Sequence, residues 1–371
     1  MSLLFADSFD HYPGTGAGKW YWGGGGAIVT SPVRTGTRAM GGGSNGPAYY
    51  PGTLTHFIVG VGVCFGSAPS ATHYASFTDN SGGDSNVNLY LSAAADGSLG
   101  LGCSWGYGAY GSDTHWGSTA AGVIADFTAY NYIELEYLVA ASGGIIKLWV
   151  DGILRCSVSG NTVGANSSAR VQLITLNTNK SGVCYDDFYL LDCTTTPNTT
   201  PFGGGTKIIA IAPNADSSPL QWTPSVGGDH FSLENTLPYD TSKYVSSNTV
   251  GQIDQYLQSL GAIPSGYVPL AVQHCMVAKL SGSGSASIVS NVGGVASSSV
   301  AALTTSWNIG FWPYDVDPAT GLAWTNAGLP SRGFGPKLTV GGGVNAQVCQ
   351  SIIEVICAAP PPSTFRASFL G

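Results

Sequence analysis

Apolar residues recur along this chain in short runs that are broken by Gly, Pro, Asn and Ser. Short runs with alternating polar positions, bounded by turn residues, are typical of β-strands. In the second half the expected strands read KIIAIA, LAVQHCMVAKL, SASIVSNV and SVAALTTSWNI. In the first half they cover residues 56–65, 85–93, 132–140, 144–150, 169–176 and 183–191. The pattern predicts an all-β protein built from sandwiches.

The clearest local unit is a hairpin over residues 132–150. YIELEYLVA alternates, Ala141-Ser-Gly-Gly supplies a turn, and IIKLWV returns. Asp151-Gly152 then turns the chain again into ILRCSV. One segment departs from the β pattern. VGQIDQYLQSL at 250–260 has a one-sided apolar stripe and is followed by Gly261, which predicts one short helix.

The chain divides at a polar stretch rich in Pro and Gly. Residues 194–206 begin TTTPNTTPFGGG, lack periodicity and predict a linker. We expect a first β-sandwich over 1–193 and a second over 207–340. Residues 341–371 hold one more expected strand, QVCQSIIEVICA, and then three prolines. We interpret this last part as a C-terminal extension that acts as an arm on a neighbouring molecule.

Composition narrows the functional classes. Charged residues make up 9% of the 371 residues, against roughly 25% in typical domains. A surface poor in Lys and Glu loses less side-chain entropy on packing against neighbours, which suits an assembly. The 13 basic residues are scattered and the net charge is −8, which argues against a nucleic-acid partner. The sequence shows no membrane-spanning apolar run and no basic start of a signal peptide, so we expect synthesis in the cytoplasm.

The eight cysteines form no Cys-x-x-Cys pair, so the sequence gives no zinc motif. If 185–192 is one extended strand, Cys184 and Cys193 lie about 30 Å apart at ~3.3 Å per residue, and a disulfide needs Cα atoms within roughly 7 Å. The same argument separates Cys349 from Cys357. We expect reduced thiols in the new chain. Inter-subunit disulfides through Cys275, Cys349 and Cys357 stay open as an alternative for released particles.

Several segments resemble a known family. LLFADSFDHY at 3–12, the hairpin, and YDDFYLLD at 185–192 resemble a concanavalin A-like, laminin-G-like sandwich. Further on, PNADSSPLQWTPSVGGDHFSLEN at 213–235, TSKYVSSNTVGQIDQY at 241–256 and DPATGLAWT, which ends at Thr325, follow in order. Together they resemble structural proteins of tailed-bacteriophage virions. The resemblance implies a concanavalin A-like jelly roll followed by a second β-sandwich, and a structural role on the capsid, neck, tail or fibre.

Two sets of carboxylates are candidate sites. Glu134 and Glu136 are two residues apart on one expected strand and share a face, as a pair for glycoside hydrolysis would. A solvated strand face is the simpler interpretation. Pairing of the first and last strands of the first sandwich would gather a second set, which suits Ca²⁺ or, more simply, turn capping. This set is Asp7, Asp10, Asp186 and Asp187.

Aromatic side chains between glycines form the third candidate. The segment 105–116, WGYGAYGSDTHW, suits a protein interface, a lid on the core or a glycan contact. Trp20 and Trp22, beside four glycines, are interpreted in the same way. The residues singled out in the segment are Trp105, Tyr107, Tyr110 and Trp116.

The sequence favours a non-enzymatic virion protein that is assembled in the host cytoplasm and decorates or stabilises the particle. Its expected partners are other capsid or tail proteins and further copies of itself, for which we expect a trimer. A glycan- or receptor-binding module of a tail fibre, recognising a host surface glycan, is the alternative. A glycan hydrolase using Glu134 and Glu136 is a third hypothesis. Ca²⁺ is the one cofactor considered.

Overall fold

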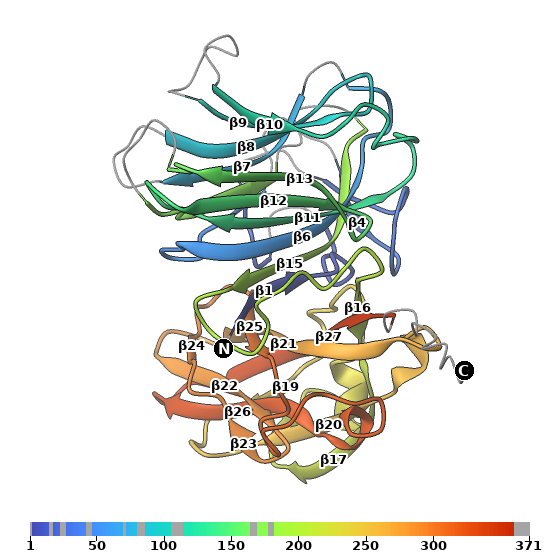
Figure 1. Cartoon of the computed structure of the whole chain (residues 1–371). Coiled ribbons are helices and arrows are strands. Elements are labelled where there is room, and N and C mark those ends of the chain that lie inside the picture. Colours follow the sequence, from blue (N-terminus) through green and yellow to red (C-terminus); the bar gives the residue numbers. More distant parts are fainter. Residues whose placement is uncertain are drawn as a thin grey trace, which may run out of the picture.

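The computed structural model describes residues 2–14, 18–22, 27–41, 47–69, 72–79, 86–104, 114–163, 169–176 and 182–359. These residues form four antiparallel sheets, two in each half of the chain (Figure 1). The all-β prediction is confirmed. Within the described part of the chain, no helix has the length and apolar character needed to cross a membrane.

The first half is a sandwich of an eight-stranded and a seven-stranded sheet. The eight-stranded sheet has the order β13-β12-β11-β6-β15-β4-β3, with β1 beside β15, and the other sheet has the order β10-β9-β8-β7-β14-β5-β2. One apolar core fills the space between them. The strands are β1 (Leu3–Asp7), β2 (Tyr21–Trp22), β3 (Ala27–Val29), β4 (Ala39–Gly41), β5 (Pro47–Tyr49), β6 (His56–Cys64), β7 (Thr72–Asp79), β8 (Asn86–Ala93), β9 (Leu99–Ser104), β10 (Thr114–Ser118), β11 (Asn131–Leu138), β12 (Gly144–Val150), β13 (Ile153–Gly160), β14 (Leu173–Leu176) and β15 (Cys184–Asp192).

The predicted hairpin is confirmed, with β11 and β12 paired along their length. Asp151 and Gly152 form the next turn, with φ of 52° and 77°. Positive φ at both positions is the geometry of a type I′ turn, which Asp-Gly favours. The first and last strands of this sandwich also pair as expected, since Asp7 of β1 lies opposite Phe188 of β15.

The second half is a sandwich of two six-stranded sheets. Their orders are β18-β19-β27-β21-β25, with β16 beside β27, and β17-β20-β26-β22-β23, with β24 beside β22. The elements are β16 (Lys207–Ile211), β17 (Pro213–Leu220), β18 (Thr223–Pro224), η2 (His230–Leu233), β19 (Val245–Ser247), β20 (Asp254–Gln258), η3 (Leu260–Ala262), β21 (Val268–Leu280), β22 (Ala286–Val292), β23 (Val295–Ala296), β24 (Ala301–Ala302), β25 (Asn308–Tyr314), η4 (Leu329–Ser331), β26 (Phe334–Gly341) and β27 (Ala346–Ala358).

The helix predicted over 250–260 is wrong. Residues 254–258 of this segment form the strand β20, and only its last residue belongs to the short 3-10 helix η3. Gly251 adopts φ 93° in the turn before β20, a conformation outside any right-handed helix. Pairing with β17 and β26 then determines the conformation of the segment, so tertiary context outweighs the helical periodicity.

The assignment of 341–371 to an extension is also wrong for its strand. β27 lies inside its sheet, where it pairs with β21, β16 and β19, and all of its residues are buried. A strand buried on both faces reads as a near-continuous apolar run, which agrees with the central place of β27 in its sheet. Residues 346–358 therefore belong to the second sandwich. Residues 360–371 lie outside the described part of the chain.

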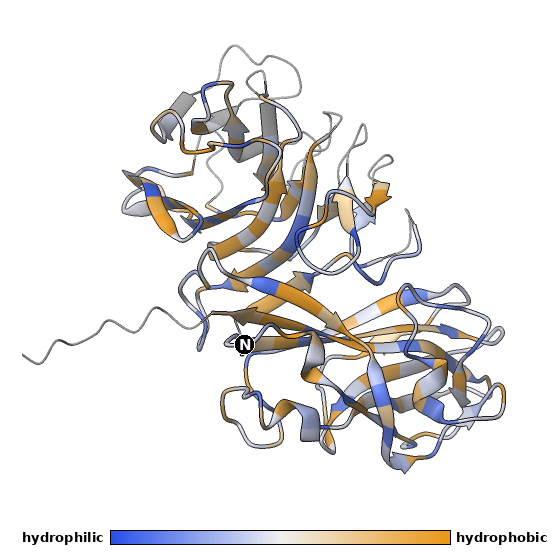
Figure 2. Cartoon of the chain, turned by 90° about the vertical axis from the view of Figure 1, so that its right-hand side faces the viewer, coloured by the Kyte–Doolittle hydropathy of each residue, from blue (hydrophilic) through white to orange (hydrophobic). Residues whose placement is uncertain are grey.

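The two sandwiches pack face to face. The outer surface of the eight-stranded sheet contributes Leu3, Ile58, Tyr189 and others to an apolar cluster shared with Ile208 and Ile356 of the second sandwich. Figure 2 shows the two lobes in contact, with the N-terminus at their boundary. β1 is consequently enclosed by both sandwiches, and the site described next lies at its end.

Candidate functional site at the junction of the sandwiches

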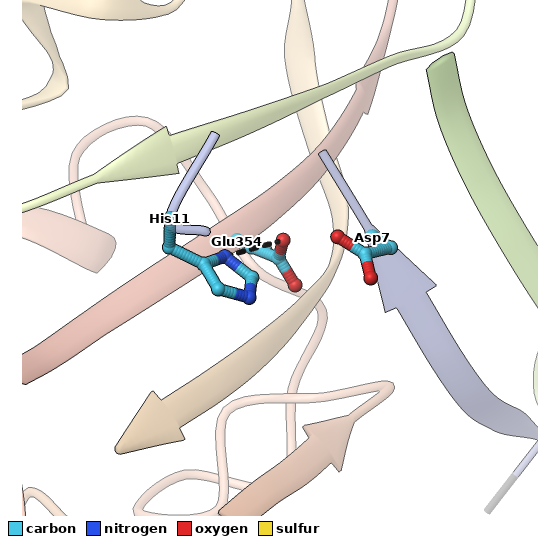
Figure 3. Close-up of side chains that lie close together, drawn as sticks. All are labelled: Asp7, His11 and Glu354. Atoms are coloured by element: carbon cyan, nitrogen blue, oxygen red, sulfur yellow. Dashed lines mark ion pairs between the residues drawn. The ribbon is translucent and has the colours of Figure 1, made fainter. Parts of the chain in front are cut away.

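A group of ionisable side chains lies between the two sandwiches. Asp7 ends β1, His11 lies in the turn after it, and Glu354 belongs to β27 (Figure 3). Each offers a ligand atom within 4.8 Å of the others, and all three are buried. Figure 3 shows Glu354 between the other two side chains. Residues from opposite ends of the chain are thus brought into one enclosed space.

Lys19 supplies the positive charge of this group, which we call the junction cluster (Asp7, His11, Lys19 and Glu354). Its ammonium lies 2.6 Å from Glu354 Oε2 and 3.6 Å from Asp7 Oδ1, and no side chain of these pairs is exposed. It also donates to the carbonyl of Ala6. A buried ion pair with further hydrogen bonds has the form in which enclosed charges are tolerated.

Neighbouring polar groups complete the junction cluster. The Ser8 amide and hydroxyl both donate to Glu354 Oε1 at 2.9 Å. The amide of Gln273 bridges the two sandwiches, because it donates to Ala6 O at 2.7 Å and to Glu354 Oε2 at 2.8 Å. On the other side, Asp7 accepts from Trp20 Nε1 at 2.6 Å and from the Tyr12 hydroxyl. Each carboxylate is therefore held by several donors.

Burial and the Lys19 charge set the protonation of the junction cluster. Burial raises the pKa of Asp7 to about 6, with Lys19 opposing that rise. Burial would likewise raise the pKa of Glu354, but the Lys19 charge and the surrounding donors hold it below its ordinary value. Burial lowers the pKa of His11 to about 3, with Lys19 acting in the same direction. His11 Nδ1 lies 3.4 Å from Glu354 Oε1, the pair joined by the dashed line in Figure 3, and neither ring nitrogen forms a hydrogen bond among the described atoms. The lowered pKa favours a neutral imidazole.

The His11→Gln variant tests this protonation state. An imidazole whose pKa falls on folding stabilises the protein fully above its unfolded pKa near 6.5 and loses that contribution as the pH falls toward 3. Between pH 7 and pH 5 the wild type should therefore lose about 2 kcal/mol relative to the variant, which does not titrate there. Urea unfolding of both proteins at the two pH values measures this. A difference that stays constant with pH would contradict a neutral His11.

The donor set of the junction cluster resembles a transition-metal site in composition but not in electrostatics. One imidazole and two carboxylates are ligands that zinc accepts. Lys19, however, already lies against both carboxylates. A metal ion there would have to displace the ammonium and compete with the donors to Glu354. The two carboxylates already have their counter-charge in Lys19.

The predicted calcium set does not assemble. Asp7 faces Lys19, whereas the other three acids bind the segment 34–38. Asp10 Oδ1 accepts from the amides of Thr37 and Arg38, and Asp186 Oδ2 accepts from the amides of Arg34 and Thr35. Asp187 forms an ion pair with Arg34. No three of the four meet as a ligand group in the described part of the chain. Turn capping, the simpler of the two interpretations, describes what Asp10 and Asp186 do.

The pair Glu134 and Glu136 shares a strand but not an environment. Glu134 is fully buried and accepts from the Tyr189 hydroxyl and the Gly203 amide. Burial raises its pKa. Glu136 is partly exposed, and its carboxylate contacts Lys147 at 2.9 Å and His56 at 3.1 Å. The pKa of Glu136 lies below its ordinary value because these contacts outweigh its partial burial. Both acids therefore have partners within the protein.

A second polar cluster, which sequence reasoning missed, lies in the second sandwich. Asp254 Oδ1 accepts from the amides of Gln221 and Trp222, and its Oδ2 lies 2.6 Å from His230 Nδ1 and 3.1 Å from the Tyr256 hydroxyl. The same hydroxyl lies 2.9 Å from Glu234. The Tyr256 hydroxyl donates to Glu234, and burial raises the pKa of Glu234 well above its ordinary value. All of these residues belong to the segments 213–235 and 241–256, which carry the family resemblance. Their place in those segments was the one sequence signal that pointed to this cluster.

The aromatic candidates separate into different environments. Trp20 is 4% exposed and stacks in the core on Phe9, so its assignment to an interface or glycan contact is wrong. The Trp20 indole N–H donates to the buried Asp7 carboxylate, and this hydrogen bond holds the ring inside the core. Trp116 is half-buried beside Tyr137. Trp22 belongs to β2, but its side chain is outside the described residues. Trp105, Tyr107 and Tyr110 also lie outside them.

The cysteines assigned to inter-subunit disulfides are core residues. Cys275, Cys349 and Cys357 are free thiols with no exposed surface. That assignment is wrong for the folded subunit, since a thiol enclosed by its own sandwich cannot reach another chain. Burial raises the pKa of Cys357 to about 12 and that of Cys275 well above its ordinary value. Cys349 and Cys357 pack as small apolar side chains, whereas the Cys275 thiol donates to Glu354 Oε2 at 3.5 Å.

Comparison with known proteins finds no family for this chain and only distant structural likenesses. No protein-family model matches the chain, and no curated protein is similar to it. The cellulose-induced protein Cip1 is 16% identical over 54% of this chain and 99% of its own, with a TM-score of 0.35. A Trypanosoma rangeli sialidase is 14% identical over 47% of this chain and 28% of its own, with a TM-score of 0.30. The binding domain of Paraclostridial Mosquitocidal Protein 1 is 12% identical over 69% of this chain and 75% of its own, with a TM-score of 0.35. The chain thus spans under a third of that sialidase, and likenesses this distant concern β-architecture alone.

Proposed function

We propose that this protein is a structural component of a tailed-phage virion, which decorates or stabilises the particle as a homo-oligomer. The observation that carries the proposal is the structural role of the segments that resemble phage virion proteins, because their polar side chains hold neighbouring loops and strands in place. Asp216 caps η2 by accepting from the amides of His230 and Phe231, and Asp254 ties two loops together. Asp317 accepts from Arg332 Nε at 2.7 Å and from the Thr320 hydroxyl at 3.1 Å. The polar side chains of these segments thus fix loops and strands in position.

Enclosure of the first strand by both sandwiches supports a scaffold role. Ser2, Ala6 and Ser8 each donate to a side chain of the second sandwich. Domains joined only by a linker move relative to each other by default, unless a large apolar interface holds them. Here an apolar cluster and the buried ion pair of Lys19 and Glu354 join the sandwiches. A rigid two-domain body transmits load between its contacts on a particle.

We assign no catalytic role to the carboxylates. A general acid and a nucleophile or base must both face the substrate across the scissile bond. Glu134 is enclosed and bound by Tyr189, and Glu136 is neutralised by Lys147. The charge-poor composition fits a protein that packs against other proteins.

A glycan-binding role is the second candidate, favoured by one exposed aromatic pair. Tyr21 is 64% exposed, Tyr50 is 49% exposed, and their rings meet edge to face at 5.9 Å. Flat aromatic faces with a polar hydroxyl suit contact with sugars as well as with proteins. This candidate requires glycan affinity that Tyr21→Ala removes, whereas the structural role requires none.

The proposal is tested by asking whether purified particles contain the protein. Quantitative mass spectrometry should find it at a fixed copy number per particle. Absence from particles that contain all other structural proteins would overturn the proposal.

A further inference from the structure

Within the described part of the chain, the sheet edges are protected with one exception. An unprotected edge strand offers unpaired N–H and C=O groups to another chain. Two long edge strands carry prolines, which are Pro313 in β25 and Pro213 and Pro219 in β17. Amides of β1 are covered by side chains of the second sandwich, and β10 is short and has an irregular register. The edge strand β16 has five residues, and its Ile208 amide donates to Asp187 of the first sandwich. The remaining edges β2, β3, β18, β23 and β24 have two or three residues each.

β13 is the exception among the described strands. It has eight residues, ILRCSVSG, no proline and one charge, and it ends the eight-stranded sheet beside β12. Ile153 is 53% exposed, Leu154 is 49% exposed, and Arg155, Ser157 and Ser159 are also exposed. No described segment pairs with its outer side. Such an edge is a template for strand addition.

The hydrogen-bond pattern identifies which groups of β13 face outward. The Asp151 amide donates to the Tyr132 carbonyl, so residues 149, 147 and 145 of β12 form their backbone hydrogen bonds with β11. Residues 148 and 146 of β12 therefore bond to β13, where they lie opposite Cys156 and Val158. The residue between that pair, Ser157, therefore directs its amide and carbonyl away from the sheet.

Ser159 and Arg155 extend this outward row. Ser159 follows Ser157 by two residues and points the same way. Arg155 lies at the irregularity where Leu148 pairs with Cys156 and Trp149 pairs with Leu154, so it has no direct partner on β12. Ser157 is thus the centre of a three-residue row of available backbone groups.

We propose that β13 pairs antiparallel with β13 of a second copy of this chain, about a two-fold axis at Ser157. This register places Ser157 opposite its twin and Arg155 opposite Ser159 of the second copy. All three outward-facing positions are then used. The two eight-stranded sheets become one continuous sheet across the dimer.

Charge and apolar pattern both fit a second copy as the occupant. A two-fold centred on Arg155 would oppose two like charges, which is destabilising, whereas the Ser157 register separates them. On the other face the register sets Cys156 opposite Val158, both half-buried and apolar. A C₂ contact needs a self-complementary patch, and this strand provides one. The inference rests on the homo-oligomeric part of the proposed function and not on its virion location.

The test compares Ser157→Pro with Ser157→Ala by analytical ultracentrifugation over a range of concentrations. Proline removes the outward amide at the centre of the contact, and an edge strand tolerates it there. Alanine keeps the amide and is the matched control. The wild type and Ser157→Ala should form dimers, and Ser157→Pro should be monomeric with an unchanged melting temperature. A monomeric wild type, or a folded Ser157→Pro that dimerises like the wild type, overturns the proposal.

A thiol at position 158 tests the register independently and covers a Ser157→Pro variant that fails to fold. In the proposed dimer Val158→Cys lies opposite Cys156 of the second copy in a non-hydrogen-bonded pair, with Cα atoms about 4.5 Å apart. That distance is within disulfide range. Mild oxidation should give a dimer band on a non-reducing gel that disappears on reduction, whereas Ser159→Cys, opposite Arg155, should give none. An oxidised Val158→Cys without a dimer band contradicts the register. Presence in particles is measured separately, so a monomeric protein found in virions would refute this contact and leave the proposed function intact.

Discussion

Replacing Lys19 with Met is expected to lower the free energy of unfolding by about 3–5 kcal/mol. Lys19 is the cation that faces both Asp7 and Glu354 in the junction cluster, and all three side chains are fully buried. Met preserves most of the volume but leaves two carboxylates enclosed without a counter-charge. Removal of one partner from a buried pair is costly because the other charge stays desolvated.

Urea denaturation of three variants measures this effect. Lys243 is exposed, so Lys243→Met is the matched control and should change stability by less than about 0.5 kcal/mol. The double variant Lys19→Met/Glu354→Gln removes the charge that Lys19→Met strands, and it should recover part of the loss. If Lys19→Met costs no more than the surface control, the junction cluster does not hold the sandwiches together.

Asp254→Ala is expected to cost a similar amount, about 3–5 kcal/mol, because several donors lose one acceptor together. The carboxylate binds the amides of Gln221 and Trp222 and contacts His230 and Tyr256. These groups lie in the loop between β17 and β18, in η2 and in β20. Each buried donor left unsatisfied costs about 1–3 kcal/mol.

Asp254→Asn separates shape from hydrogen bonding. Its amide oxygen can still accept from Gln221 and Trp222, so the Asn variant should lose clearly less stability than the Ala variant. Thermal melting followed by circular dichroism compares the two. Equal losses would mean that the cluster around Asp254 acts through packing alone.

Local patterns predicted the elements whose partners are close in sequence. The hairpin of β11 and β12 and the Asp151-Gly152 turn follow from alternation and turn residues, which act within a few positions. The helix predicted over 250–260 failed because its apolar spacing fits both a helix and a buried strand. Pairing with β17 and β26 selects the strand, and that partner choice is not encoded in the segment itself.

The junction cluster could not be predicted because its parts are distant in sequence. Lys19 and Glu354 are 335 residues apart. One signal was nevertheless present, since Glu354 interrupts the apolar run SIIEVICA. A charge inside a buried strand requires a partner, although the sequence does not say which. The error of treating 341–371 as an arm hid this signal, because a charge in an arm needs no explanation.

We propose that this chain is a passive structural part of a virion. Quantitative mass spectrometry of particles purified from a lysate of the host that carries the gene tests it most directly, with the major capsid protein as the internal standard. The account predicts a constant ratio of this chain to capsid protein across preparations. A high ratio would indicate capsid decoration, and a low constant ratio the neck, tail or fibre. A chain that stays in the soluble lysate, or whose ratio falls with each round of purification, would contradict the account.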